Sequence, residues 1–399
     1  MPLRPPAGFR SAFYDPLKVA DAPTIGAGTA GNTQATVEFT APSNVGGAAI
    51  TQYYAVSDPS QITGNAASSP ITVTGLTNGT PYTFRVWALN SFGPSPYSAA
   101  TGSVTPVNAR GLFAGGFRTS LSNIIDYISI YSTGNAVDFG DLAAASQAGA
   151  SCSSSIIGVF TGQGSTNAQQ VTILTTGNST SFASIVNPTA QGSTAACSNN
   201  TRGLFAGAYA VTSQWSNIEY ITFASAGNSV SFGQLSAKRG YAGGVSNSTR
   251  GVFGGGAYVE SATFFAVNVI DYVTISTTGN AIDFGDMSQN RYQYGSCSNS
   301  TRGLFGGGFV SSAVNTIDYI TISTTGNAVD FGDLTASKSN IGACASSVRG
   351  VWGGGYTTTP INNIDYVTIS TLGNASNFGS LTTVASSLTS CSNAHGGLS

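Results

Sequence analysis

The sequence predicts an all-β chain in which a small β-sandwich is followed by a six-bladed β-propeller closed by the C-terminal strand. Glycine accounts for 51 of 399 residues and charged residues for only 8%, whereas a typical soluble domain has about 25% charged residues. Short alternating segments are separated by turn residues, which is typical of β-structure. The second part of the chain contains six repeats whose starts are 45–52 residues apart, a period that suits four-stranded propeller blades.

Charge and hydropathy exclude several classes of protein. A net charge of −2 argues against a general binder of nucleic acids or membrane surfaces. Residues 1–10 lack the apolar segment of a signal peptide, and no apolar run approaches the roughly 18 residues needed to span a bilayer. We therefore expect a protein that is made in a cytoplasm and does not insert into a membrane.

Residues 1–20 predict an extended N-terminal arm. Proline removes backbone donors and fixes φ, and four prolines occur here: Pro2, Pro5, Pro6 and Pro16. One interpretation is a disordered tail. The other is an arm that becomes ordered on a partner, and the aromatic residues favour it. The expected docking residues are Arg4, Phe9, Phe13 and Tyr14.

Residues 21–106 predict a separate sandwich, because alternating segments at 35–39, 50–56, 71–73 and 82–88 are separated by turn residues such as Asn78-Gly79. The stretch 76–88, together with Pro23 and the segment 39–42, resembles fibronectin type III domains. That resemblance implies a spacer or docking module with no chemistry of its own.

Residues 107–399 contain the repeats, and an Arg-Gly pair opens five of them. The arginines are Arg110, Arg202, Arg250, Arg302 and Arg349, whereas the second repeat has Ile157. Each repeat carries a Gly-Asn pair, for which we expect a tight hairpin with positive φ. A phenylalanine follows five residues after the turn glycine, and an aliphatic residue or methionine comes three residues later. We expect these two side chains to pack between blades.

The chain ends predict how the ring closes. Residues 391–398 repeat the junction at residues 297–304 but have no blade after them, while the first repeat lacks the strand that should precede Arg110. We therefore expect the strand around Cys391 to complete the first blade, which removes an exposed sheet edge.

The glycine clusters that follow an aromatic strand, the Asp-Tyr strand and the repeat length resemble kelch repeats. The resemblance has two departures: phenylalanine stands where kelch repeats have tryptophan, and the second repeat reads Gly162-Gln163-Gly164. A six-bladed kelch-like propeller is the fold that this resemblance implies, but the function of the family does not transfer with it.

An acid stands at one position of five repeats, and glutamine replaces it in the second repeat, which also lacks the arginine. We interpret this as structural ion pairs within or between blades, since a guanidinium can bind a carboxylate in a bidentate manner. The expected pairs are Arg110–Asp126, Arg202–Glu219, Arg250–Asp271, Arg302–Asp318 and Arg349–Asp365.

Cysteines and histidine give no sign of a metal, a cofactor or a catalytic residue. The five cysteines (Cys152, Cys197, Cys297, Cys344 and Cys391) share one repeat position, and the remaining repeat has Val245 there. This pattern predicts a small buried filler and no disulfide. His395 is the only histidine, which is too few for a metal centre. We expect no enzyme, although paired carboxylates for glycoside hydrolysis stay open.

Loops that break the repeat are where a ligand would bind. Between the first two strands of repeats three and four lie five aromatic residues: Tyr209, Trp215, Tyr258, Phe264 and Phe265. They are candidates for one patch that stacks on sugars or anchors a protein interface. The alternative is that they fold back over the core of their own blades.

The order of arm, fibronectin type III module and glycine-rich kelch-like propeller resembles virion structural proteins of tailed phages, especially cyanophages. Residues 4–9 and 11–17 carry much of this resemblance. It implies a non-enzymatic capsid, neck or tail appendage whose arm docks on other virion proteins. The alternatives are a carbohydrate-binding protein for host adsorption and, third, a polysaccharide hydrolase. A homo-oligomer is compatible with each of them.

Overall fold

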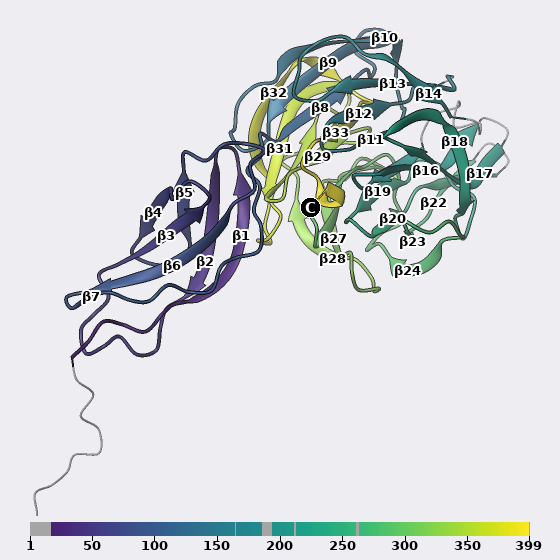
Figure 1. The fold of residues 1–399 in the computed structure, drawn as a ribbon. Coiled ribbons are helices and arrows are strands. Elements are labelled where there is room, and N and C mark those ends of the chain that lie inside the picture. Colours follow the sequence, from purple (N-terminus) through teal and green to yellow (C-terminus); the bar gives the residue numbers. More distant parts are fainter. Residues whose placement is uncertain (1–16, 164, 186–193, 211–212, 261–262, 399) are drawn as a thin grey trace, which may run out of the picture. The chain divides into compact units, whose positions relative to one another are not determined.

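The chain divides into two compact units, with the boundary between Asn108 and Ala109. The computed structural model describes residues 17–163, 165–185, 194–210, 213–260 and 263–398, and Figure 1 shows their fold. Arg4, Phe9, Phe13 and Tyr14 lie outside the described residues, so their docking role stays a prediction.

The first unit is a sandwich of two antiparallel sheets. One sheet contains β1 (Thr24–Gly31), β2 (Gln34–Thr40) and β5 (Ile71–Thr74), and the other contains β4 (Thr63–Ala66), β3 (Gln52–Asp58), β6 (Thr83–Asn90) and β7 (Gly93–Pro94). Side chains alternate between the core and solvent along β2 and β6, as expected of strands with one buried face. The alternation seen in the sequence is therefore the cause of the layer structure.

The described part of the second unit contains six antiparallel four-stranded sheets. We number them in chain order. Sheet 1 contains β33 (Thr389–Ser392), β8 (Arg110–Ala114), β9 (Ser122–Ser129) and β10 (Val137–Ser146). Sheet 2 contains β11 (Ser151–Ser153), β12 (Ile157–Phe160), β13 (Asn167–Thr172) and β14 (Thr180–Ser184). Sheet 3 contains β15 (Ala195–Ser198), β16 (Arg202–Ala210), β17 (Ser213–Thr222) and β18 (Ser225–Gln234).

The remaining sheets follow the same order. Sheet 4 contains β19 (Gly243–Ser246), β20 (Arg250–Gly254), β23 (Val269–Thr274) and β24 (Ile282–Asp286). The extra length of its repeat forms a separate hairpin of β21 (Ala257–Glu260) and β22 (Thr263–Ala266). Sheet 5 contains β25 (Gly295–Ser298), β26 (Arg302–Gly306), β27 (Thr316–Thr321) and β28 (Val329–Asp333). Sheet 6 contains β29 (Gly342–Ala345), β30 (Arg349–Gly353), β31 (Ile361–Thr368) and β32 (Ser376–Ala385), and a short 3-10 turn spans Gly396–Leu398.

The innermost strands of the six sheets lie next to one another in a ring. Strand β11 contacts β15, β15 contacts β19, and the series continues through β25 and β29 to β33, which contacts β11 again. The predicted pairing at the closure is confirmed, because β33 pairs with β8 and places Cys391 opposite Leu112. In Figure 1 the yellow β33 accordingly lies beside the blue β8.

The closure rebuilds a junction that is continuous elsewhere in the chain. Within the intact junctions the side chain of Asn299 accepts a hydrogen bond from the backbone N–H of Arg302 at 2.7 Å. Asn393 accepts the same bond from Arg110 at 2.8 Å, although 283 residues separate the two. The first and last segments of the second unit together therefore reproduce the turn that a continuous chain forms at the other junctions.

Packing between neighbouring sheets uses the positions that the repeats predicted. Phe139 and Leu142 of sheet 1 share a buried cluster with Phe160, Val171 and Ile173 of sheet 2. Equivalent clusters join the other sheets. The repeated phenylalanine and aliphatic residue are therefore confirmed as contacts between sheets.

The prediction of a tight Gly-Asn hairpin is wrong. Residues 322–328 separate β27 from β28, which is too long for a two-residue turn. The pair instead binds the outer strand of the preceding sheet: Gly326 N–H donates to the carbonyl of Phe284 at 2.8 Å, and Asn327 Oδ1 accepts from Asp286 N–H at 3.0 Å. Gly-Asn is therefore a contact between sheets.

Deleting residues 389–399 is expected to abolish the cooperative thermal unfolding transition of the second unit, because β8 loses its partner and exposes its edge. The measurement is near-ultraviolet circular dichroism during heating. The milder variant Asn393→Ala is expected to cost about 1 kcal/mol, since it removes one hydrogen bond. A truncated chain that stays monomeric and unfolds at the same temperature would contradict the closure.

Candidate functional site

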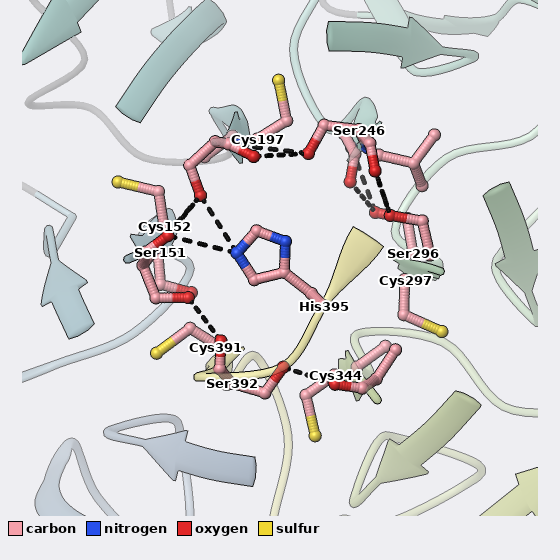
Figure 2. Close-up of a pocket in the computed structure, with 18 of the residues that line it drawn as sticks. Ser151, Cys152, Cys197, Ser246, Ser296, Cys297, Cys344, Cys391, Ser392 and His395 are labelled. Carbon is pink, nitrogen blue, oxygen red and sulfur yellow. Dashed lines mark hydrogen bonds between the residues drawn. The ribbon is translucent and has the colours of Figure 1, made fainter. Parts of the chain in front are cut away.

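The centre of the ring is a cavity of about 60 Å³, and its lining residues include serine, cysteine, alanine and His395. Serine hydroxyls at the ends of the inner strands form a circuit of hydrogen bonds, interrupted only at Ala345, in which each donates to the carbonyl of the preceding sheet (Figure 2). The circuit consists of Ser153 to Ser392, Ser198 to Ser153, Ser246 to Ser198, Ser298 to Ser246 and Ser392 to Ala345, at 2.6–2.8 Å. Polar groups inside the ring are thereby paired with each other.

His395 lies in the middle of this circuit (Figure 2), and both of its ring nitrogens form hydrogen bonds within the fold. Gly397 N–H donates to Nδ1 at 3.1 Å, so Nδ1 is an acceptor and the proton lies on Nε2. Nε2 then donates to the carbonyl of Ser153 at 3.1 Å. Burial lowers the pKa of His395 to about 4, and the hydrogen bond to Ser153 opposes this only in part. The imidazole is therefore neutral and fills the centre of the ring.

The two glycines after His395 allow the chain to cross the ring. A Cβ atom on Gly396 would lie 2.6 Å from the carbonyl oxygen of Ser246, and one on Gly397 would overlap the carbonyl of Ser198. We call residues 395–397 the plug. Its backbone rests directly on the inner strands, which closes this end of the ring.

The thiols are buried fillers, as predicted. All five cysteines are free and buried, and in Figure 2 the sulfur atoms point outward from the ring centre. Each fills the space left by the glycine that opens the next sheet: a Cβ on Gly251 would lie 2.7 Å from Cys197 Sγ. Burial raises the pKa of Cys297 and of Cys391 to about 12. These thiols stay protonated and are not nucleophiles.

The predicted ion pairs are wrong in their basic partner. Asp318 is fully buried, and its carboxylate lies 3.0 Å from Arg291 Nη2. In the strand register Asp318 is opposite Phe305, three residues from Arg302. An odd spacing puts side chains on opposite faces of a sheet, so Arg302 cannot reach this carboxylate.

The same correction applies to the other acids. The observed pairs are Arg118–Asp126 at 3.5 Å, Arg239–Asp271 at 2.9 Å and Lys338–Asp365 at 3.0 Å. Glu219 accepts a hydrogen bond from Ser229 at 2.6 Å. Arg239, Arg291 and Lys338 lie in the connections between sheets, and each pairs with an acid of the following sheet. Arg118 lies within sheet 1, between β8 and β9, but Thr382 of sheet 6 donates to Asp126 at 2.6 Å. All four aspartates therefore bind residues that link their sheet to the preceding one.

The repeated arginine pairs with tyrosine instead. The guanidinium carbons of Arg110, Arg202, Arg250, Arg302 and Arg349 lie 4.5–4.8 Å from the ring centres of Tyr127, Tyr220, Tyr272, Tyr319 and Tyr366. Arg302 also donates to the carbonyl of Ile369 in the next sheet at 2.8 Å. The second repeat has Ile157 and Gln170 at these positions. Arginine and tyrosine are thus present together and absent together.

The five predicted aromatic residues do not form one cluster. Tyr209 and Phe264 have ring centres 5.2 Å apart. Tyr258 and Phe265 stack on each other at 5.2 Å, and the pairing of Tyr258 with Phe265 and of Val259 with Phe264 puts them on the other face of the hairpin. Trp215 is opposite Ala208, the neighbour of Tyr209, and therefore also faces the other way.

Three aromatic residues that were not predicted complete the cluster around Tyr209 and Phe264. They are Tyr241, Tyr292 and Phe309, with successive ring centres 5.4–5.9 Å apart. We call these five residues the aromatic ladder. Tyr241 and Tyr292 lie just after Arg239 and Arg291 in the connections between sheets. Neither tyrosine lies at a position that the strand repeats mark, so the sequence comparison of the repeats did not reveal them.

Within the described ranges, no three His, Cys, Asp or Glu side chains are placed to bind a metal ion. The described residues also contain no helix of the length and hydropathy that a membrane span requires.

The sandwich belongs to a known family. Residues 21–103 match the model of the fibronectin type III domain, in agreement with the resemblance noted in the sequence. Among curated proteins, none matches the chain.

Arg291→Met is expected to lower the free energy of unfolding by about 3–5 kcal/mol, because it leaves the Asp318 carboxylate buried without a counter-charge. Arg302→Met removes a half-exposed cation–π contact and hydrogen bond, and about 1–2 kcal/mol is expected. Urea denaturation of both variants measures the difference. A larger loss for Arg302→Met would support the originally predicted pair.

The stability of the second unit is expected to depend on pH through His395. Its folded pKa of about 4 lies below the unfolded value of 6.5, so its contribution is fully present above pH 6.5 and is lost as the pH falls to about 4. At 1.36 kcal/mol per pKa unit the loss is about 3 kcal/mol. The free energy of unfolding, measured by urea denaturation at several pH values between 7 and 4.5, should fall less steeply with decreasing pH for His395→Gln than for the native chain. Equal slopes would contradict the plug.

Proposed function

We propose that the second unit is a six-bladed kelch-like β-propeller and that the chain is a non-enzymatic appendage of a tailed-phage-like virion. The non-enzymatic part of the proposal is supported by one observation: the thiols, the imidazole and the buried carboxylates all have structural roles. The thiols fill space beside glycines, His395 closes the ring, and the buried acids join neighbouring sheets. Such a unit is a rigid body for display.

The virion assignment is supported by composition and module order. A chain with 8% charged residues and many Gly, Ser, Thr and Asn residues is suited to a particle surface. A fibronectin type III domain at residues 21–103 is a common spacer. In this proposal residues 1–20 and the sandwich attach to the particle, at its capsid, neck or tail, and the propeller is displayed.

Adsorption to a host-surface glycan is a second proposed function, and one observation favours it. The aromatic ladder runs from Tyr209 in β16 to Phe264 in the β21–β22 hairpin and on to Tyr241, Tyr292 and Phe309 in the connecting segments. Phe264 is 40% exposed. Aromatic faces with polar neighbours are suited to stacking on sugar rings.

Immunogold labelling with antibodies against residues 109–399 is expected to mark purified particles at one defined location. A chain without residues 1–16 should fold but fail to join the particle, because the proposed docking residues are gone. Residues 17–20 are kept because Ala20 is buried in the core of the sandwich. Mass spectrometry of the particles gives the copy number of each form. Equal incorporation of both forms would show that the arm is not the attachment.

A further inference from the structure

The end of the ring opposite the plug contains a second cavity, of about 150 Å³. The inner strands begin at this cavity and end at His395, so it is the open mouth of the ring. None of its described lining residues is charged. They are hydroxyl, amide, aromatic and small apolar residues, among them Tyr241, Gln293, Asn340 and Thr194. We call this space the mouth cavity.

One residue from each of five sheet connections forms the rim of the mouth cavity. These rim residues are Ala148, Tyr241, Gln293, Asn340 and Ser387, with φ between 46° and 60°. Side chains other than glycine rarely adopt this conformation, and such residues concentrate at functional sites. Backbone hydrogen bonds link the rim, for example from Ser387 N–H to Asn340 O at 2.8 Å and from Asn340 N–H to Gln293 O at 2.7 Å. The fold thus holds these side chains in fixed positions.

An independent observation points to a ligand. Thr194 lines the mouth cavity and is 8% exposed, and its hydroxyl oxygen has no hydrogen-bond partner among the residues that the structure describes. A buried hydroxyl without a partner is unfavourable, so a polar group in the cavity would satisfy it.

The aromatic ladder begins at the rim, because Tyr241 belongs to both. Its ring lies 5.9 Å from Phe264 and 5.9 Å from Tyr292. Phe264 and Tyr292 are nearly parallel, with 6° between their planes. The other neighbouring rings of the ladder are inclined to each other by 37–63°. A stepped aromatic surface, exposed at Phe264, therefore begins at the rim of a neutral polar cavity.

We propose that the mouth cavity binds a neutral saccharide, with one sugar in the cavity and the next sugars stacked on the aromatic ladder. Gln293, Asn340 and Thr194 would exchange hydrogen bonds with sugar hydroxyls, which can both donate and accept. The uncharged lining offers no counter-charge for an anionic or cationic ligand. This assignment rests on the proposed adsorption function and gives its ligand and site.

The test uses the full chain on an array of neutral oligosaccharides of glucose, galactose, mannose, rhamnose and N-acetylglucosamine, with uronate- and sialate-containing oligosaccharides beside them. Binding to neutral members is expected, with weaker signals from the anionic ones. Titration calorimetry with the strongest neutral oligosaccharide then gives the dissociation constant. Binding to anionic members alone, or to no member at millimolar concentration, overturns the proposal.

Gln293→Gly separates binding from folding. Glycine favours the φ of 60° at this position, so the melting temperature should be unchanged or higher, while affinity should fall at least tenfold. Thr194→Val should also weaken binding at least tenfold. The matched control is Gln61→Gly, a glutamine with φ of 52° in the sandwich, and it should bind as the native chain does.

Unchanged affinity in both Gln293→Gly and Thr194→Val overturns the cavity assignment even if saccharide is bound elsewhere on the chain. Adsorption to whole host cells is measured separately. Saccharide binding without cell adsorption would contradict the adsorption function and leave the cavity assignment standing.

Discussion

The pairing of β33 with β8 is the contact on which the second unit depends. Each sheet buries its repeated phenylalanine and aliphatic residue against the next sheet, so a sheet without a neighbour would expose apolar surface. A ring supplies every sheet with two neighbours, but only if its ends are joined. Here the join is made by backbone hydrogen bonds and by Asn393 binding Arg110, which restores the turn found at the intact junctions.

Much of this architecture could be predicted from the sequence because the second unit consists of sequence repeats. The repeat spacing, the repeated phenylalanine and the copy of the junction near Cys391 each follow from comparing the repeats with one another. The alternation in β2 and β6 likewise revealed the sandwich. Patterns of this kind report which positions are equivalent and which are buried.

Repetition could not tell which residue contacts which, and the ion pairs show why. Arg302 and Asp318 occur together because both belong to the regular repeat, but they lie on opposite faces of the sheet. The partner of Asp318 is Arg291, from the connection that precedes its sheet. Comparison within single repeats conceals a contact between successive repeats. The aromatic ladder was missed for the same reason, since Tyr241 and Tyr292 come from connections and not from strands.

The split junction has a consequence for how the protein is made. The sandwich is complete once its own residues have left the ribosome, because all its strands lie within residues 24–94. Sheet 1 begins with β8 but waits for β33, nearly the whole unit later. During synthesis the five sheets between them can form in order, each on the one before. The nascent chain therefore carries an unpaired β8 edge until the end, and it is during this interval that the protein is most exposed to mispairing with other chains.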